Sequence, residues 1–184
     1  DCTGHGVPGA IMSVICSNAL NEVVNNKHIH QPDLILNEVR NMVTASFKKQ
    51  GESTQKDGMD IALVRLLETN GKTTLQFAGA NNPLWIVRKG EPSTPSDNII
   101  STSTHHLIEI KADKQPIGNY EKMNPFTLHQ LDLQSGDTIY SFSDGYADQF
   151  GGTFGKKMKY KPLKDLILSI QDKEMSEQNT ILYN

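Results

Sequence analysis

Apolar residues near the start of the chain recur at the spacing of an α-helix. The recurring positions are Ile11, Met12, Ile15, Ala19, Leu20, Val23 and Val24. Pro8 suits the first turn of a helix, because its fixed φ fits there and its missing N–H has no helical partner to lose. The 3.6-residue period therefore predicts a helix that runs to about Asn26.

A second apolar stripe begins after Gln31-Pro32-Asp33, which suits the start of a helix. Its members are Leu34, Ile35, Val39, Met42, Val43 and Phe47. A helix with this stripe buries one face and leaves the other polar. Residues 48–57 are polar, and we predict a loop there.

From residue 61 the pattern changes to short runs that are typical of strands. We predict strands at residues 61–66, 73–78, 84–88, 106–110, 126–131 and 138–142. Asn70-Gly71 predicts a tight hairpin turn between the first two strands. Residues 91–104 are rich in Ser, Thr and Pro, residues 151–161 carry glycines and lysines, and we predict exposed loops at both places.

Helices return at the end of the chain. One is predicted from Pro162 to about Gln171, and a last one begins near Lys173 or Met175. Helices therefore come first and last, with a run of strands between them. This segregation predicts an α+β fold, with helices packed on antiparallel sheets.

Composition narrows the class of protein. The chain has 184 residues, 36% of them hydrophobic, which is enough for one globular domain over residues 1–184. Trp85, Phe142 and Phe150 lie in apolar runs, and we expect them in its core. Eighteen basic and 21 acidic residues give a net charge of −3. That balance does not indicate a nucleic-acid partner.

Cysteine use and hydropathy bear on the compartment. Cys2 and Cys16 are too few for a disulfide framework, which favours a reduced, cytoplasmic setting. No stretch approaches the roughly 20 apolar residues of a membrane span, so we expect no membrane contact by this domain.

Asp1 stands where a strand ends, and residues 176–180 stop within a helical pattern. We therefore expect an internal piece of a longer protein, without its first strand or strands.

Two aspartates stand where a strand ends and a glycine-rich turn begins. Asp1 opens the run Asp1-Cys2-Thr3-Gly4-His5-Gly6, and Asp144 follows the apolar residues 138–142 in Ser143-Asp144-Gly145-Tyr146. Glycines let a backbone turn sharply and approach a ligand closely. Ionised carboxylates at such points can bind a metal. We therefore predict a shared divalent-metal site; the alternative is that each aspartate only caps its turn.

Asp57 and Asp60 flank Gly58-Met59 just ahead of the first strand. Either could reach the same sheet edge as Asp144, or both could be plain loop residues. The Cys2-x-x-His5 spacing is typical of zinc ligands, but a structural zinc site needs about four, and no second such pair lies nearby.

A cluster of lysines lies shortly after Asp144. It consists of Lys156, Lys157, Lys159 and Lys161. Such a run is most simply a solvated face. The functional interpretation is that it attracts a phosphorylated partner.

Four motifs in order give the chain a family resemblance. They are Asp1-Cys2-Thr3-Gly4-His5-Gly6-Val7-Pro8-Gly9-Ala10, Phe77-Ala78-Gly79-Ala80-Asn81-Asn82-Pro83-Leu84, Lys114-Gln115-Pro116-Ile117-Gly118, and Gly136-Asp137 followed by Ser143-Asp144-Gly145-Tyr146-Ala147-Asp148-Gln149-Phe150-Gly151-Gly152. Together they closely resemble the SpoIIE-type branch of the metal-dependent serine/threonine protein phosphatases, the PPM class. The resemblance covers essentially the whole chain.

That resemblance implies an α-β-β-α sandwich with two Mn²⁺ or Mg²⁺ ions at one edge of the paired sheets. By this likeness Asp1 would bridge both metals, the backbone carbonyl of Cys2 would add a ligand, and Asp144 would bind one metal, with Gly145 beside it. A metal-activated water would then attack a phosphoserine or phosphothreonine directly, which is consistent with the preference of such hard ions for oxygen ligands.

The chain departs from the family pattern at several points. The family has a further acidic ligand on a strand before Asp1 and a late aspartate near its C-terminus, and we expect both outside this sequence. Asn81 and Asn82 stand where a charged residue is often found. His5 is displaced from the histidine of the eukaryotic members, so no proton-transfer role is assigned to it.

The predicted function is that of a hydrolase, a bacterial-type signalling phosphatase acting on a phosphorylated protein. The family leads us to expect an anti-anti-sigma-like substrate and an upstream sensor or receiver region. One alternative is a non-catalytic phosphoprotein-binding or scaffold module with the same fold. Another two-metal hydrolase, such as a phosphodiesterase, is a weaker alternative, because those sites usually use His ligands in spaced pairs.

Overall fold

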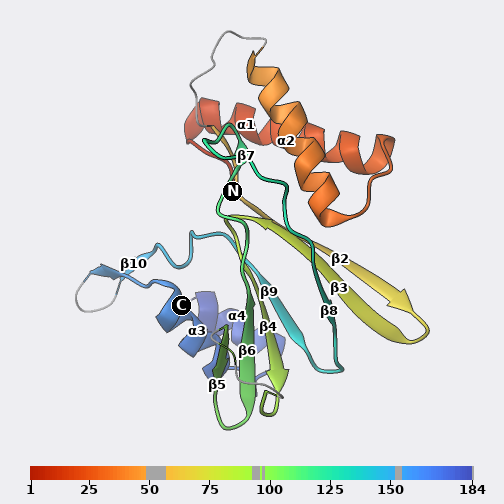
Figure 1. Ribbon diagram of the computed structural model, residues 1–184. Helices are drawn as coiled ribbons and strands as arrows, with labels where there is room; N and C mark the ends of the chain where they lie inside the picture. Colours follow the sequence, from red (N-terminus) through yellow and green to blue (C-terminus); the bar gives the residue numbers. More distant parts are fainter. Residues whose placement is uncertain (49–56, 93–95, 97, 152–154, 184) are drawn as a thin grey trace. The chain divides into compact units, whose positions relative to one another are not determined.

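Helices and antiparallel sheets make up the computed structural model, which describes residues 1–48, 57–92, 96, 98–151 and 155–183 (Figure 1). They form two compact units. Unit 1 comprises Asp1–Leu84 and Lys111–Gln134, and unit 2 comprises Trp85–Ile110 and Ser135–Asn184. The predicted α+β class is confirmed. That residues 1–184 act as one catalytic domain stays a prediction.

Two helices open unit 1. Helix α1, Gly6–Asn21, continues into the π-helical turn η1, Glu22–Asn26, and α2 spans Pro32–Lys48. Both predicted helices are confirmed. The buried stripe of the first is Met12, Cys16, Ala19 and Val23; that of the second is Ile35, Leu36, Val39 and Val43. The prediction for Leu34 was wrong: it is 49% exposed, because the buried face of α2 begins at Ile35 and includes Leu36.

The helical stretch Gly6–Asn26 corrects the expectation about membrane spans. By length and composition alone it is long and apolar enough to cross a membrane. The core helix of a soluble protein and a signal sequence pass the same test, so this single helix is weak evidence for a span. In unit 1 one side of the stretch packs against α2.

A three-stranded sheet of order β2-β3-β8 forms the other part of unit 1. Strand β2 spans Ile61–Thr69, β3 spans Lys72–Ala80 and β8 spans His129–Asp132. The predicted hairpin turn is confirmed, since Asn70 has φ 52° and Gly71 has φ 73° between the paired residues Thr69 and Lys72. Two left-handed residues give the turn twist that suits a hairpin.

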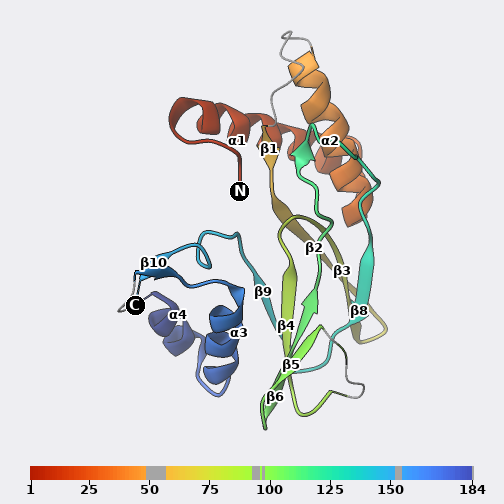
Figure 2. The same ribbon diagram turned by 60° about the vertical axis from the view of Figure 1, so that its left-hand side comes forward.

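Two very short strands in unit 1 were not predicted. Strand β1, Gly58–Met59, pairs antiparallel with β7, Ile117–Gly118 (Figure 2). The predicted loop before them falls on residues 49–56, outside the described residues, apart from its two ends. Two residues are too few to show an alternating pattern, so only the pairing reveals these strands.

Unit 2 contains a sheet of order β5-β6-β4-β9. Its strands are β4, Leu84–Lys89; β5, Ile99–Ser101; β6, His105–Ile110; and β9, Thr138–Ser141. The prediction of a loop throughout residues 91–104 was wrong at β5, which pairs with β6. Helices α3, Tyr160–Ser169, and α4, Met175–Tyr183, confirm the predicted C-terminal helices.

The core of unit 2 is rich in aromatic rings. Trp85 is fully buried, and its ring centroid lies 4.3 Å from that of Phe142. Phe150 was predicted to join this core, but its side chain is 72% exposed. It lies on β10, Phe150–Gly151, which pairs with β11, Lys156–Lys157. A hairpin therefore stands where we predicted a loop.

Candidate metal-binding segments

The segment that carries Asp1 lies against the segment that carries Asp60. Cys2 bridges Met59 in antiparallel register. The main-chain nitrogen of Asp1 donates to the Asp60 carbonyl at 2.8 Å, and the Asp60 N–H donates to the Asp1 carbonyl at 2.7 Å. Asp1 and Asp60 thus exchange both backbone hydrogen bonds, which makes them directly opposite residues.

This register sorts the side chains between two faces. Opposite residues of an antiparallel pair project to the same side, so the carboxylates of Asp1 and Asp60 share a face. Cys2 and Met59 project to the other side, where Met59 is 6% exposed and Cys2 packs against the same core. Of the two secondary candidates, Asp60 is therefore the one that pairs with Asp1, whereas Asp57 precedes β1.

The same register bears on the Cys2 backbone. Because Asp1 and Asp60 form the hydrogen-bonded pair, the next pair along, Cys2 and Met59, is a non-hydrogen-bonded one. The Cys2 carbonyl therefore points away from β1. A carbonyl in that direction is able to accept a ligand, as the predicted role of Cys2 requires.

Asn81 is a neighbour of this pair that sequence reasoning did not select as a site residue. Its side-chain nitrogen Nδ2 donates to Asp60 Oδ1 at 2.7 Å, and its N–H donates to the Asp113 carbonyl at 2.9 Å. Asn81 has φ 59°, in the left-handed region that asparagine tolerates better than most residues. The signal was the run Asn81-Asn82-Pro83 directly after β3, and its conformation orients the Asp60 carboxylate.

Two glycines fix the distance between β1 and β7. Gly58 faces Gly118 in the register. A Cβ on Gly58 would lie 2.4 Å from the Ile117 carbonyl oxygen, and one on Gly118 would lie 2.5 Å from the Asp57 carbonyl oxygen. The two backbones approach so closely that neither position has room for a side chain. Gly118, in the Pro-Ile-Gly motif, is thus a second residue that supports the Asp1 segment and that spacing alone did not reveal.

Asp144 and Gly145 belong to unit 2. Asp144 is exposed in the turn after β9, and its carbonyl accepts the Asp148 N–H at 2.8 Å. Tyr146 anchors the turn by donating its hydroxyl to the Leu182 carbonyl at 2.8 Å, and Ala147 is buried. The turn thus leaves the Asp144 carboxylate toward solvent. That Asp144 shares cations with Asp1 stays a prediction.

The thiol of Cys16 lies under the Asp1 segment. It is 1% exposed and donates to Met12 Sδ at 3.6 Å. Burial, and after it the neighbouring Cys2 thiol, raises the pKa of Cys16 to about 12. Cys16 is therefore a neutral, buried thiol at physiological pH.

His5, which forms the Cys-x-x-His spacing with Cys2, is exposed at the N-cap position of α1 and makes no side-chain hydrogen bond to the helix.

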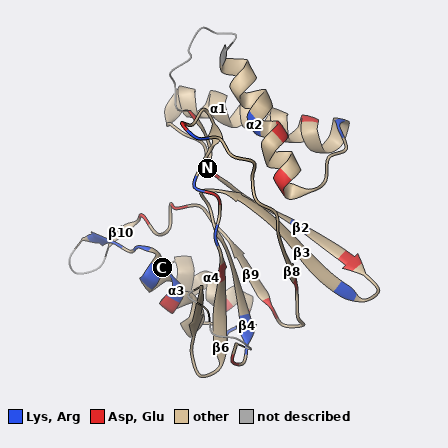
Figure 3. Cartoon of the chain, viewed as in Figure 1, with Lys and Arg blue, Asp and Glu red and all other residues tan. Residues whose placement is uncertain are grey.

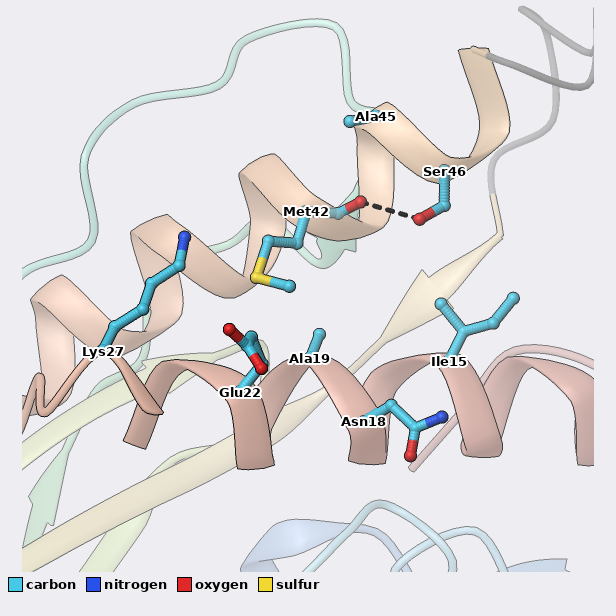
Figure 4. Close-up of a pocket in the computed structure, with 8 residues that line it drawn as sticks. All are labelled: Ile15, Asn18, Ala19, Glu22, Lys27, Met42, Ala45 and Ser46. Atoms are coloured by element: carbon cyan, nitrogen blue, oxygen red, sulfur yellow. Dashed lines mark hydrogen bonds between the residues drawn. The ribbon is translucent and has the colours of Figure 1, made fainter. Parts of the chain in front are cut away.

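A groove of about 710 Å³ lies between α1 and α2 (Figure 4). Ile15, Ala19 and Met42 face one another there, and Ser46 donates to the Met42 carbonyl at 3.0 Å. The remaining lining residues are Asn18, Glu22, Lys27 and Ala45. Because none of the predicted ligands lines it, this groove is not part of the candidate metal site.

The donor set suits hard divalent cations. Asp1 and Asp60 supply carboxylate oxygens on one face, and Cys2 supplies a carbonyl; these are ligands that Mg²⁺ and Mn²⁺ prefer. Among the described residues, no group of three or more His, Cys, Asp or Glu side chains could hold a metal ion. Unit 1 thus provides a carboxylate pair, which fits part of a metal site and needs at least one further acidic ligand.

Comparisons with known proteins agree with the motifs. The family model of stage II sporulation protein E, SpoIIE, matches residues 1–183. The solved structure of the SiaA-PP2C domain of Pseudomonas aeruginosa matches with a TM-score of 0.75 and 25% sequence identity. That match covers 100% of this chain and 64% of the other. No curated protein gives a significant match. With a family model matched from the first residue to nearly the last, this chain belongs to the SpoIIE family.

Proposed function

We propose that this protein is a metal-dependent serine/threonine protein phosphatase. Membership of the SpoIIE family and the likeness to a PP2C domain support phosphatase-type chemistry. The observation that carries the proposal is the reciprocal pairing of Asp1 with Asp60, which holds two carboxylates on one face with the Cys2 carbonyl beside them. The proposed substrate is phosphoserine or phosphothreonine on a signalling protein.

In this proposal Asp1, the Cys2 carbonyl and Asp144 hold two Mn²⁺ or Mg²⁺ ions, and Asp60 supports Asp1. When bound, the ions lower the pKa of a water and balance charge on the phosphate oxygens. The residues of the chain set the geometry. The backbone pair fixes Asp1 relative to Asp60, and the Asn81 amide holds one oxygen of Asp60 in place.

The proposal extends to partners and compartment. The SiaA-PP2C likeness favours a regulatory domain that acts on a phosphoprotein, and we propose an anti-anti-sigma-like substrate and an upstream sensor or receiver region. Both described cysteines are free thiols, which supports a reducing, cytoplasmic setting.

Phosphate release from a phosphoserine peptide by the full-length protein, with and without manganese, tests the proposal. Asp1→Ala and Asp144→Ala should each lower kcat roughly a thousandfold or more, which corresponds to about 4 kcal/mol of barrier. Asp172→Ala, an exposed aspartate in the turn after α3, is the matched control and should leave kcat unchanged.

The outcomes separate the two candidate functions. Activity that persists in Asp1→Ala and Asp144→Ala would remove the metal roles. Manganese binding by calorimetry with no turnover of any phosphopeptide would favour a non-catalytic phosphoprotein-binding module. Loss of both manganese binding and turnover in the two variants, with the control intact, supports the phosphatase.

A further inference from the structure

A basic hairpin in unit 2 has no part in the proposed chemistry. Strand β10 pairs with β11 through Phe150↔Lys157 and Gly151↔Lys156. Lys159 and Lys161 follow at the start of α3, and Figure 3 shows the blue of lysine on this hairpin and at the start of that helix. Residues 148–161 contain four lysines and a single acidic residue, Asp148, in a chain whose net charge is −3.

Three of the four lysines are available for a partner. Lys157 is engaged, because its Nζ lies 2.7 Å from Asp148 Oδ2 and 5.7 Å from the centroid of the Phe150 ring. Lys156, Lys159 and Lys161 are exposed, and no carboxylate among the described residues pairs with them. Unpaired positive charges at this density attract acidic ligands.

A groove lies beside Lys156. It has a volume of about 340 Å³, and its apolar lining comes from Phe150, Met158 and Pro162. Lys156 completes one wall, with Gln149 and Gly151. Phe150 is 72% exposed, so its ring is available to an apolar group of a partner. The groove thus offers an apolar seat with one lysine in its lining, and Lys159 and Lys161 are close in sequence to Met158 and Pro162.

The hairpin is tied to the turn that carries Asp144. Met158 N–H donates to the Gln149 carbonyl at 3.0 Å, and Lys159 N–H donates to the Ala147 carbonyl at 2.7 Å. Residues 147–149 continue directly from the Asp144 turn, whose carbonyl accepts the Asp148 N–H. The lining of the groove therefore begins at Gln149, five positions after Asp144, the predicted metal ligand of the same unit.

We propose that the β10–β11 hairpin and the first turn of α3 dock an acidic segment of the phosphoprotein substrate, with one apolar side chain in the groove. Charge complementarity selects this occupant: Lys156, Lys159 and Lys161 match carboxylates, and Phe150 and Met158 match an aliphatic side chain. The inference rests on the proposed phosphatase function for the identity of the partner. The docking chemistry itself rests on unit 2.

Fluorescence anisotropy with the full-length protein tests the docking without any turnover. The probe is a labelled phosphoserine peptide with Asp and Glu on both sides and one Leu; its partner probe has Asn and Gln in their place. The acidic peptide should bind about tenfold more tightly than the neutral one, and the difference should shrink as salt is added.

The variants locate the surface. K156E/K159E/K161E should weaken binding of the acidic peptide about tenfold or more, and Phe150→Ser about fivefold. The control K72E/K122E/K173E changes net charge equally at exposed lysines elsewhere and should retain binding within about twofold. Lys→Gln at the three hairpin positions, which removes charge without reversing it, should give an intermediate loss.

Several outcomes would overturn the docking. They are equal binding of the two peptides, equal loss in the control variant, or tighter binding of a single-stranded oligonucleotide or of phosphatidylserine vesicles to the same lysines. Hydrolysis of p-nitrophenyl phosphate with manganese reports separately on the phosphatase. Peptide binding that depends on the hairpin in a protein without that hydrolysis would support the docking and reject the enzyme.

Discussion

The two units hold their predicted metal ligands in different ways. In unit 1, Asp1 is fixed by a residue 59 positions away, through two backbone hydrogen bonds with Asp60. In unit 2, Asp144 is set by its own turn, through a bond to the Asp148 N–H four residues on. Long-range pairing makes the position of Asp1 depend on the fold of the whole unit. The Asp144 turn closes locally, and distant contacts support the residues that follow Asp144, since Tyr146 donates to the Leu182 carbonyl and Lys159 N–H donates to the Ala147 carbonyl.

The surroundings of Asp1 are more tightly packed than those of Asp144. Beneath the Asp1 segment lie the thiol of Cys16 and the close pair Gly58 and Gly118. The Asp144 turn is anchored at Tyr146 and at the buried Ala147, whereas Asp144 and Gly145 themselves are exposed. We therefore expect changes near Asp1 to act through stability, and changes near Asp144 to act mainly through chemistry.

The largest expected effect is a loss of unfolding free energy at alkaline pH, through the Cys16 thiol of unit 1. The pKa of Cys16 is raised from 9.0 to about 12, chiefly by burial. Above pH 9 the unfolded chain releases this proton and the folded chain keeps it. The stabilisation is thus full below pH 9 and is lost as the pH rises to 12, on the order of 4 kcal/mol in all.

Urea unfolding at pH 8 and pH 11 measures this loss. Cys16→Ala should be less stable than the unmodified protein at pH 8 but should lose far less stability at pH 11. In unit 2, burial raises the pKa of Tyr140 above 10.0, so its stabilisation disappears only above about pH 10. Tyr140→Phe is the matched variant. Parallel pH dependence of Cys16→Ala and the unmodified protein would contradict the role of the thiol.

The elements that the sequence could predict are those that depend on contacts between residues close in sequence. The two N-terminal helices and the Asn70-Gly71 hairpin depend on local periodicity and turn chemistry, and both were predicted. Strands β1 and β7 have two residues each and exist because their glycines permit close approach, which no local pattern shows. Asp1 was selected from its motif, whereas Asn81 needed the structure because its partner is 21 residues away.

Alanine in place of a glycine should have an effect of intermediate size, and the effect should differ between the Asp1 segment and the Asp144 turn. Gly118→Ala would place a Cβ 2.5 Å from the Asp57 carbonyl oxygen, so β1 and β7 must separate. We expect a loss of about 3 kcal/mol in the free energy of unfolding, as in overpacked cores. A Cβ on Gly145 would lie 3.5 Å from Ser143 Oγ, and its φ is not left-handed. Gly145→Ala should therefore change stability by less than about 0.5 kcal/mol.

Chemical denaturation of the two variants checks this pair, and kcat adds a second reading. Similar destabilisation by both would mean that the Asp144 turn is as constrained as the Asp1 segment. A normal stability with reduced kcat in Gly145→Ala would place Gly145 against the substrate or a cation.

The smallest expected effect concerns the amide that orients Asp60. Asn81→Gly keeps the left-handed backbone accessible and removes the 2.7 Å hydrogen bond to Asp60 Oδ1. Loss of a hydrogen bond to a charged group costs about 1.5 kcal/mol, so manganese should bind roughly tenfold more weakly by calorimetry. Asn70 is the control: it has φ 52° in the β2–β3 turn, at the opposite end of that hairpin from Asp60. Asn70→Gly should leave manganese affinity unchanged. Equal weakening of manganese binding by both substitutions would show that backbone freedom, and not the Asn81 amide, determines the orientation of the Asp60 carboxylate. The carboxylates of Asp1 and Asp60 would then be no better ordered than that of Asp144 in unit 2.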